Sequence, residues 1–201
     1  MIDRQAFFDY AREHLFGGTM SQSQVDGITG ILDAWENDWD ESDDRHLAYM
    51  LATAHHETDR TMQPIAEYGK GKNKMYGQRL KQNGSPYMDT PALFYGRGFV
   101  QLTWYENYYR AGKLLGIDLI HYPELAMMPE HATKIMFYGM RDGWFTGVAL
   151  KHYFNASRGE WVQARRIING LDRAELVAGY GRLYHAALQA GFSDVVSGVV
   201  Q

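Results

Sequence analysis

The stretch FYGRGFVQLTWYENY, residues 94–108, says most about the fold of this chain. It combines polar side chains, among them Gln101 and Thr103, with flat aromatic faces such as that of Trp104. The two glycines of its YGRG segment would let the backbone approach a ligand closely. Sugars present a similar mixture of hydroxyl groups and apolar ring faces, so this stretch predicts a carbohydrate-binding site.

The length and composition of the whole chain are those of one soluble globular domain. At 201 residues, with 45% hydrophobic and 22% charged residues, we expect a single domain over residues 1–201. The net charge of -4 gives no electrostatic case for binding nucleic acid. The sequence has no cysteine, which excludes a disulfide framework and a thiolate nucleophile.

The pattern of apolar residues predicts a mostly helical chain. Helical spacing and end signals predict helices over 4–15, from Ser21, from about Asp44, over about 104–116, from Pro129, and over about 160–168 and 173–189. The helical pattern disappears from residue 63 to residue 101, where glycine-containing turns separate short aromatic or β-branched pieces. We expect a small antiparallel sheet or hairpin there.

The segment HHETDR, residues 55–60, places a carboxylate at the end of the third predicted helix. A zinc site of the HExxH type needs a histidine four residues after His56, and that position is Arg60. No metal is therefore expected, and His55 and His56 are interpreted as packed or supporting residues. Glu57 continues an apolar stripe formed by Leu47, Met50, Leu51 and Ala54. Burial there favours a protonated carboxyl, which suits a general acid.

A resemblance to a known family rests on these segments. HET at 56–58, FYGRGFVQLTWYENY at 94–108 and IING at 167–170, in this order, resemble the family-19 chitinases and the related bacteriophage endolysins of the lysozyme-like superfamily. The resemblance covers roughly residues 45–190, and residues 14–36 resemble the N-terminal helices of phage-encoded members. It implies a mainly α, lysozyme-like α+β fold with two helical lobes, a small antiparallel β element and a central glycan cleft.

The resemblance also implies roles for individual residues. Glu57 corresponds to the proton-donating glutamate of the family. Gln101 and Thr103 fall where the family binds sugar and places water, although Thr103 could be a plain strand residue, and Asn169 falls on an asparagine that contacts substrate. The remaining candidate substrate contacts are Arg97, Tyr95 and His56.

Several of these assignments have alternatives. Arg97 could instead be an ion-pair partner that holds its lobe together, and Asn169 could be a helix cap. For Trp104, a place in the core is favoured over a sugar platform.

The second carboxylate is expected to be Glu67, ten residues after Glu57. This spacing matches the endolysin branch, whereas plant-type chitinases place their base further downstream. Its irregular polar surroundings would let Glu67 stay ionised and activate water. The alternatives are that Glu67 pairs with a lysine of its own loop, Lys70 or Lys72, or that Asp59 is the base, although Asp59 points away from Glu57.

These residues predict a glycosidase that works by single displacement. Glu57 would protonate the glycosidic oxygen while Glu67 directs water onto the opposite face of the sugar, with the two carboxyls about 6.5–9.5 Å apart. The expected substrate is the β-1,4-linked glycan of peptidoglycan, as for a phage or prophage endolysin. One alternative is a chitinase that cleaves N-acetylglucosamine polymers, and another is an inactive glycan-binding or structural phage module.

The sequence also sets expectations for partners and location. Hydrolysis of an acetal needs only carboxyls and water, so no cofactor is expected. Charges near the N-terminus interrupt any apolar stretch of signal-peptide length, and no membrane-spanning run is visible. We therefore expect a monomer without membrane insertion that accumulates in the cytoplasm and reaches the cell wall after release through a separate membrane lesion.

Overall fold

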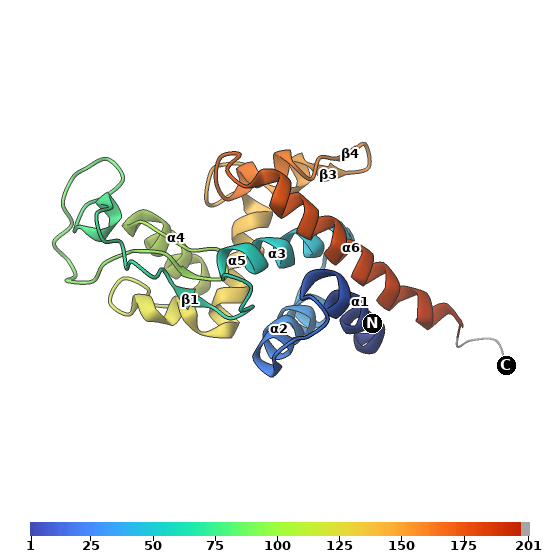
Figure 1. Ribbon diagram of the computed structural model, residues 1–201. Coiled ribbons are helices and arrows are strands. Elements are labelled where there is room, and N and C mark those ends of the chain that lie inside the picture. Colours follow the sequence, from blue (N-terminus) through green and yellow to red (C-terminus); the bar gives the residue numbers. More distant parts are fainter. Residues whose placement is uncertain (198–201) are drawn as a thin grey trace.

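The computed structural model describes the backbone of residues 1–197 and the side chains of residues 1–192, and it is mainly helical (Figure 1). The α-helices are α1 (Arg4–Leu15), α2 (Gln22–Asp38), α3 (Asp44–Glu57), α4 (Tyr105–Leu115), α5 (Pro129–Asp142) and α6 (Ala174–Ser197). The 3-10 helices are η1 (Met75–Gly77), η2 (Pro123–Met127), η3 (Leu150–His152) and η4 (Gln163–Ile167). The short strands are β1 (Ile65–Ala66), β2 (Arg97–Gly98), β3 (Phe154–Asn155) and β4 (Arg158–Gly159). This confirms the expected mainly α fold with a small β element.

The helix ends follow the signals in the sequence. Ser21 and Gln24 form the predicted capping box at the start of α2. Pro129 is the first residue of α5, and Gly116 ends α4 in the left-handed conformation. Towards the C-terminus the predictions were less accurate, because the segment near 160–168 forms the 3-10 helix η4, α6 continues to Ser197, and the β3–β4 hairpin was not foreseen.

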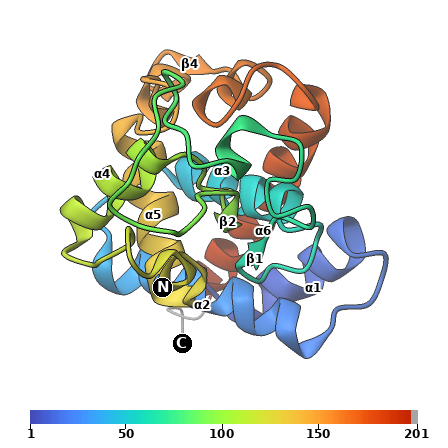
Figure 2. The same ribbon diagram turned by 90° about the vertical axis from the view of Figure 1, so that its left-hand side faces the viewer.

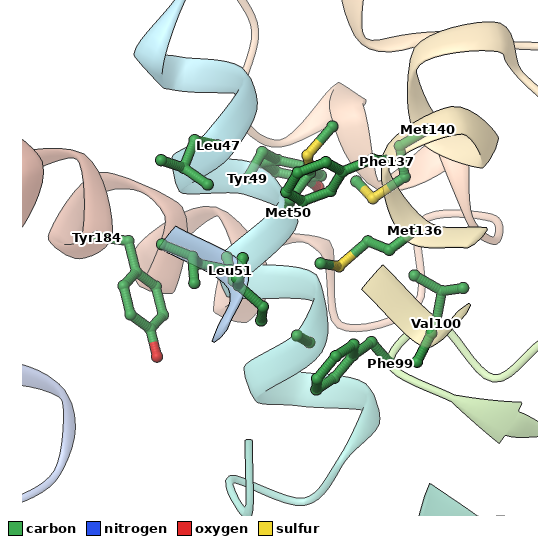
Figure 3. Close-up of a cluster of buried hydrophobic side chains, with 14 of the residues drawn as sticks. Leu47, Tyr49, Met50, Leu51, Phe99, Val100, Met136, Phe137, Met140 and Tyr184 are labelled. Carbon is green, nitrogen blue, oxygen red and sulfur yellow. The ribbon is translucent and has the colours of Figure 1, made fainter. Parts of the chain in front are cut away.

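Helix α3 forms the centre of the molecule. Every residue from His46 to His55 is buried, and a helix that is covered on all sides is expected in the core of a protein. Helix α6 packs along both α3 and α1. On the opposite side, Met136 and Met140 of α5 contact the α3 face that carries Met50 (Figure 3). This packing fixes the position of the C-terminal end of α3.

The remaining elements form two lobes on either side of α3. One lobe contains α1, α2 and α6, and the other contains α4, the β1–β2 pair and the long segment between these strands (Figures 1 and 2). Strands β1 and β2 are antiparallel, with Ile65 opposite Gly98 and Ala66 opposite Arg97. This pairing joins the segment that follows α3 to the YGRG segment. It therefore brings the sequence segments that carry the candidate residues to one region.

Candidate active site

Glu57 is the last residue of α3, and its surroundings hold it firmly. The next residue, Thr58, is fully buried; its hydroxyl donates to the carbonyl of Ala54 at 2.7 Å and accepts from the amide of Met62 at 3.1 Å. The chain then turns through left-handed conformations at Asp59 and Arg60. Because the helix is packed on all sides and its end is capped by Thr58, the Glu57 carboxyl has a defined place.

The carboxyl of Glu57 forms an ion pair with Arg165 of η4. Nη1 of Arg165 lies 2.7 Å from Oε1 of Glu57, and the two side chains are 3% and 16% exposed. Nε of Arg165 donates to the carbonyl of Asp172, and its own carbonyl accepts from the amide of Asn169. Arg165 therefore connects the end of α3 to the IING segment. Its guanidinium thus fixes the position of the Glu57 carboxyl.

Glu57 lines a polar cavity of about 390 Å³, where the end of α3 meets the start of α4 and the segment that follows η4. Among the predicted site residues, Gln101, Thr103 and Asn169 line the same cavity. Its remaining wall residues are Tyr76, Gln82, Val100, Trp104, Asn107, Phe145 and Ile168. The structure thus brings together the HET, QLTW and ING segments, which are far apart in the sequence. The roles predicted for these residues stay predictions.

Gln101 and Thr103 present different groups to this cavity. The side-chain amide of Gln101 donates to the carbonyls of Ile65 at 3.2 Å and Gly98 at 3.3 Å, and Gln101 itself has a φ of 52°. A non-glycine residue in this region is uncommon and marks strain that the surrounding structure must hold. The hydroxyl of Thr103 has no hydrogen-bond partner within the described part of the chain, so it is free to contact a ligand.

The two glycines of the YGRG segment serve the protein's own packing, which corrects the expectation that they admit a ligand. A Cβ atom on Gly96 would lie 2.6 Å from Oε1 of Gln101. Gly98 has a φ of 84°, and a Cβ there would lie 2.8 Å from the carbonyl oxygen of Ala126. These glycines allow Gln101 and η2 to approach the β1–β2 pair closely.

Glu67 follows β1 and is not among the residues that line the cavity containing Glu57. Its Oε1 accepts from the hydroxyl of Tyr76 at 3.1 Å, and its Oε2 accepts from the amide of Gly96 at 3.2 Å. It forms no ion pair with Lys70 or Lys72 among the described residues. The alternative in which Glu67 pairs with a lysine of its own loop is therefore excluded. Glu67 bonds instead to Tyr76, which lines the cavity.

The rival carboxylate, Asp59, accepts from the exposed Tyr68 at 3.2 Å. It does not line the cavity that contains Glu57. Its position gives no support to a role as base.

Arg97 is a structural residue, which corrects its assignment as a substrate contact. Its side chain is buried and donates to the carbonyl of Leu93 at 3.0 Å and to the hydroxyl of Tyr108 at 3.0 Å. Its guanidinium lies over the ring of Tyr95 at 3.7 Å from the ring centre. The ion-pair alternative also fails, because no carboxylate of the described residues pairs with Arg97. Tyr95 does not line the cavity, so its predicted substrate contact rests on the resemblance alone.

The two histidines before Glu57 are packed rather than arranged around a metal. His55 is fully buried, and Nδ1 lies 2.9 Å from the hydroxyl of Tyr184. Burial lowers the pKa of His55 to about 4. Burial also lowers the pKa of His56, against the opposing effect of the Glu57 charge. His56 does not line the cavity, and its predicted substrate contact stays a prediction.

Trp104 corrects the expectation that it belongs to the core. It is half-buried, lines the cavity and has a φ of 73°. Tyr108, one turn later on α4, is fully buried and fills the core position instead. Asn169 lines the cavity, and its Oδ1 accepts from the amide of Gly170 at 2.8 Å. The C-cap of η4 is Ile168 rather than Asn169, and the predicted substrate contact of Asn169 stays a prediction.

Sequence reasoning missed Arg165, Tyr76 and Asn107. The signal for Asn107 was its place among the polar residues of the quoted stretch, and its side chain donates to the carbonyl of Thr103 at 2.9 Å. Arg165 stands directly before the IING segment, but no local pattern joins it to Glu57. Tyr76 lies in an irregular loop whose fold the sequence does not specify.

No other region of the described chain offers a comparable site. No cluster of histidine and acidic side chains suited to a metal ion occurs among the described residues. Within the same part of the chain, no helix is long and apolar enough to cross a membrane. A second cavity of about 440 Å³ lies between α2 and α5, but its carboxylates, including Asp26 and Asp38, are exposed and none of the candidate site residues lines it.

The fold and the site define a lysozyme-like α+β protein with a glutamate at the wall of a polar cleft. Residues 33–181 match the family model of glycoside hydrolase family 19, described as chitinase class I. The chain belongs to this family, which confirms the resemblance seen in its sequence.

Two of the relatives in sequence are plant proteins. An endochitinase of Arabidopsis thaliana is 30% identical over 129 residues, which make up 64% of this chain and 44% of that protein. A basic endochitinase of Brassica napus is 26% identical over 174 residues, or 85% of this chain and 60% of that protein. The chain thus spans about half the length of these relatives.

Solved structures agree with the fold. Chitinase C of Streptomyces griseus superposes with a TM-score of 0.61 at 24% identity, covering 94% of this chain and 76% of that one. A class IV chitinase of Zea mays gives a TM-score of 0.58 at 16% identity, covering 92% and 94% of the two chains. At these identities the likeness concerns the fold alone.

Proposed function

We propose that this protein hydrolyses β-1,4 glycosidic bonds between N-acetylated sugars, with Glu57 as the general acid and Glu67 as the base. The observation that carries the proposal is the shared cavity, which Glu57 lines together with Thr103, Gln101 and Asn169. Glu57 protonates the leaving oxygen, and Glu67 activates water on the other face of the sugar. Arg165 holds the Glu57 carboxylate in place once its proton has passed to the leaving oxygen.

Peptidoglycan is the substrate that we propose, and the charge beside the cleft supports it. Lys70, Lys72 and Lys74 are exposed on the loop that carries Tyr76, and none has an ion-pair partner in the part of the chain that the structure describes. Chitin is uncharged, whereas the peptides of peptidoglycan carry carboxylates. In a chain of net charge -4, an unpaired basic loop at the cleft favours the anionic polymer.

Chitin is the second candidate, and the names of the relatives favour it. Both plant proteins are endochitinases, and both structural neighbours are chitinases. The two polymers share the N-acetylated ring and the β-1,4 linkage, so the cavity residues suit either. A third relative is an inactive chitinase-like protein of Hevea brasiliensis, which is 39% identical over 57 residues. Its name supports the further alternative of a non-hydrolytic role.

Digestion of both polymers by the purified protein tests the proposal. We expect mass spectrometry to find soluble disaccharide-peptide fragments from peptidoglycan, whose reducing-end sugar identifies the bond that is cut. Release of chitin oligomers alone would move the assignment to a chitinase. Binding of both polymers without cleavage of either would contradict the enzymatic proposal and indicate an inactive glycan-binding module.

The lysine loop gives a sharper test of substrate choice. We expect replacement of Lys70, Lys72 and Lys74 together by glutamine to slow peptidoglycan digestion several-fold and to weaken its dependence on salt. Cleavage of chitin oligomers should not change. Lys151→Gln, an exposed lysine on η3, is the matched control. Equal losses on both substrates would show that the loop contributes to folding or chemistry rather than to recognition of charge.

A further inference from the structure

Tyr76 contacts both Glu67 and the cavity. Its side chain lines the cavity that contains Glu57, whereas Glu67 does not line it. The hydroxyl of Tyr76 donates to Oε1 of Glu67 at 3.1 Å. Its ring packs edge-on against Trp104, with ring centres 5.6 Å apart and planes at 77°. Tyr76 therefore contacts the carboxylate at one end and the cavity wall along its ring.

The backbone of the loop gives Tyr76 a defined position. A Cβ atom on Gly77 would lie 1.9 Å from the carbonyl oxygen of Gly71, so the two ends of this short loop touch in a way that only glycine permits. The amide of Lys74 donates to the carbonyl of Gly71 at 2.9 Å, and the amide of Gly77 donates to that of Lys74 at 3.1 Å. Tyr76 projects from the 3-10 turn η1 that these contacts close.

The tyrosine hydroxyl is a permanent donor to the carboxylate. Burial, followed by the nearby charge of Glu67, raises the pKa of Tyr76 to about 12. The phenol therefore keeps its proton throughout the pH range in which glutamate titrates. The amide of Gly96 holds the second oxygen of Glu67, so each oxygen has one fixed donor and keeps further lone pairs for water.

We propose that Tyr76 is a positioning residue that holds the carboxylate of Glu67, the proposed base, in a fixed orientation beside the cavity, an inference that rests on the proposed function. A hydrogen bond donated to the charged form of a carboxylate favours that form. Arg97 of β2 and Tyr108 of α4, whose pKa the Glu67 charge helps to raise, bond to each other at 3.0 Å, and neither donates to Glu67. Tyr76 is thus the side chain that controls this carboxylate.

The variant Tyr76→Phe removes the hydroxyl and keeps the ring against Trp104. We expect kcat to fall about tenfold with little change in KM, because a hydrogen bond to a charged group is lost. The acidic limb of the pH–rate profile should move to higher pH, since the charged form of Glu67 is less favoured. Tyr68→Phe is the matched control, because Tyr68 is exposed and loses the same kind of bond to a different carboxylate, Asp59.

A double variant shows whether Tyr76 acts through Glu67. In a Glu67→Gln background, Tyr76→Phe should have almost no additional effect on the residual rate. A full tenfold loss in that background would overturn the inference, as would an unchanged pH profile in Tyr76→Phe. If Tyr76 had a merely structural role, Tyr76→Phe would lower thermal stability with or without Glu67→Gln. The pH–rate profile would then stay where it is in the wild type.

A measurement that needs no activity separates this inference from the proposed function. Carbon NMR of the Glu67 carboxyl should titrate at higher pH in Tyr76→Phe than in the wild type or in Tyr68→Phe. If the wild type cleaves no glycan but this difference is found, the proposed function fails and the positioning contact stands. If the wild type cleaves glycan and the three titrations coincide, the inference about Tyr76 fails alone.

Discussion

The ion pair between Glu57 and Arg165 joins residues that lie 108 positions apart in the sequence. The proposed role of Glu57 as the general acid requires its carboxyl to be held in place and to exchange a proton with the substrate. The pair therefore has to be understood as a positioning contact as well as a contribution to stability.

Removing the arginine should destabilise the protein. We expect Arg165→Met to lower the free energy of unfolding by about 3 kcal/mol, because it leaves the largely buried carboxylate of Glu57 without a partner. Urea unfolding measures this difference. Adding Glu57→Gln to Arg165→Met removes the unpaired charge and should recover a large part of the loss. Unfolding curves of Arg165→Met and the wild type that coincide would contradict the importance of this pair.

At the residue scale, the sequence predicts some site members and not others. Glu57 could be found because it continues the apolar stripe of α3, and Gln101 and Thr103 because they stand in a distinctive stretch. The partner Arg165 depends on how η4 returns to α3, which no local pattern encodes. Arg97 was misassigned because a buried arginine bonded to backbone carbonyls looks, in sequence, like one that binds a ligand.

At the scale of elements, helix α2 offers a matched pair of glycines. A Cβ on Gly27 would lie 1.8 Å from the carbonyl oxygen of Met62, whereas a Cβ on Gly30 would meet nothing within 4 Å. Gly27→Ala should therefore lower the free energy of unfolding by about 2 kcal/mol. Gly30→Ala should raise it by roughly 0.5–1 kcal/mol through helix propensity. Denaturant unfolding of both variants checks the signs, and equal effects would contradict the close contact of α2 with the segment after α3.

Helix boundaries with strong local signals were predictable, and weak ones were not. The capping box at Ser21, Pro129 and the left-handed Gly116 act through contacts within a few residues, so their chemistry is visible in the sequence. The β3–β4 hairpin has strands of only two residues each, which is too short for an alternating pattern to show. Its position depends on Arg45 of α3, which donates to the carbonyls of Asn155 and Arg158.

At the scale of the whole molecule, His55 makes stability depend on pH. It connects α3 to Tyr184 of α6, and Phe16, just after α1, packs against its ring. Its pKa in the folded protein is about 4, below the ordinary value of 6.5, so the unfolded chain binds the proton more readily between these values. Stability is complete above pH 6.5 and falls as the pH drops towards 4, by about 3 kcal/mol in all.

Urea unfolding at several pH values measures this dependence. His55→Asn keeps a hydrogen-bonding atom near the hydroxyl of Tyr184 and removes the titration, so its unfolding free energy should change less between pH 6.5 and 4. The exposed His14→Asn is the control and should follow the wild type. A wild-type protein that is equally stable at pH 4.5 and pH 7 would contradict a buried neutral histidine at this position.

The overall arrangement of the elements could be predicted from the family resemblance more than from the periodicity of apolar residues. Helical spacing predicted the elements, whereas the expectation of a cavity shared by the HET, QLTW and ING segments came from the order of these segments in the family. The fold of the loop between β1 and β2 was beyond both kinds of reasoning, because glycine contacts and single hydrogen bonds determine it. That loop supplies Tyr76 and the unpaired lysines.

The most direct test of the central claim compares glycan cleavage by the wild type, Glu57→Gln and Glu175→Gln. Glu175 is an exposed carboxylate in the first turn of α6, outside the cavity. We predict that Glu57→Gln lowers the rate at least about 100-fold while the protein still binds glycan, because the proton donor is lost, and that Glu175→Gln cleaves like the wild type. Cleavage by Glu57→Gln at the wild-type rate would contradict the assignment of this cavity as the active site.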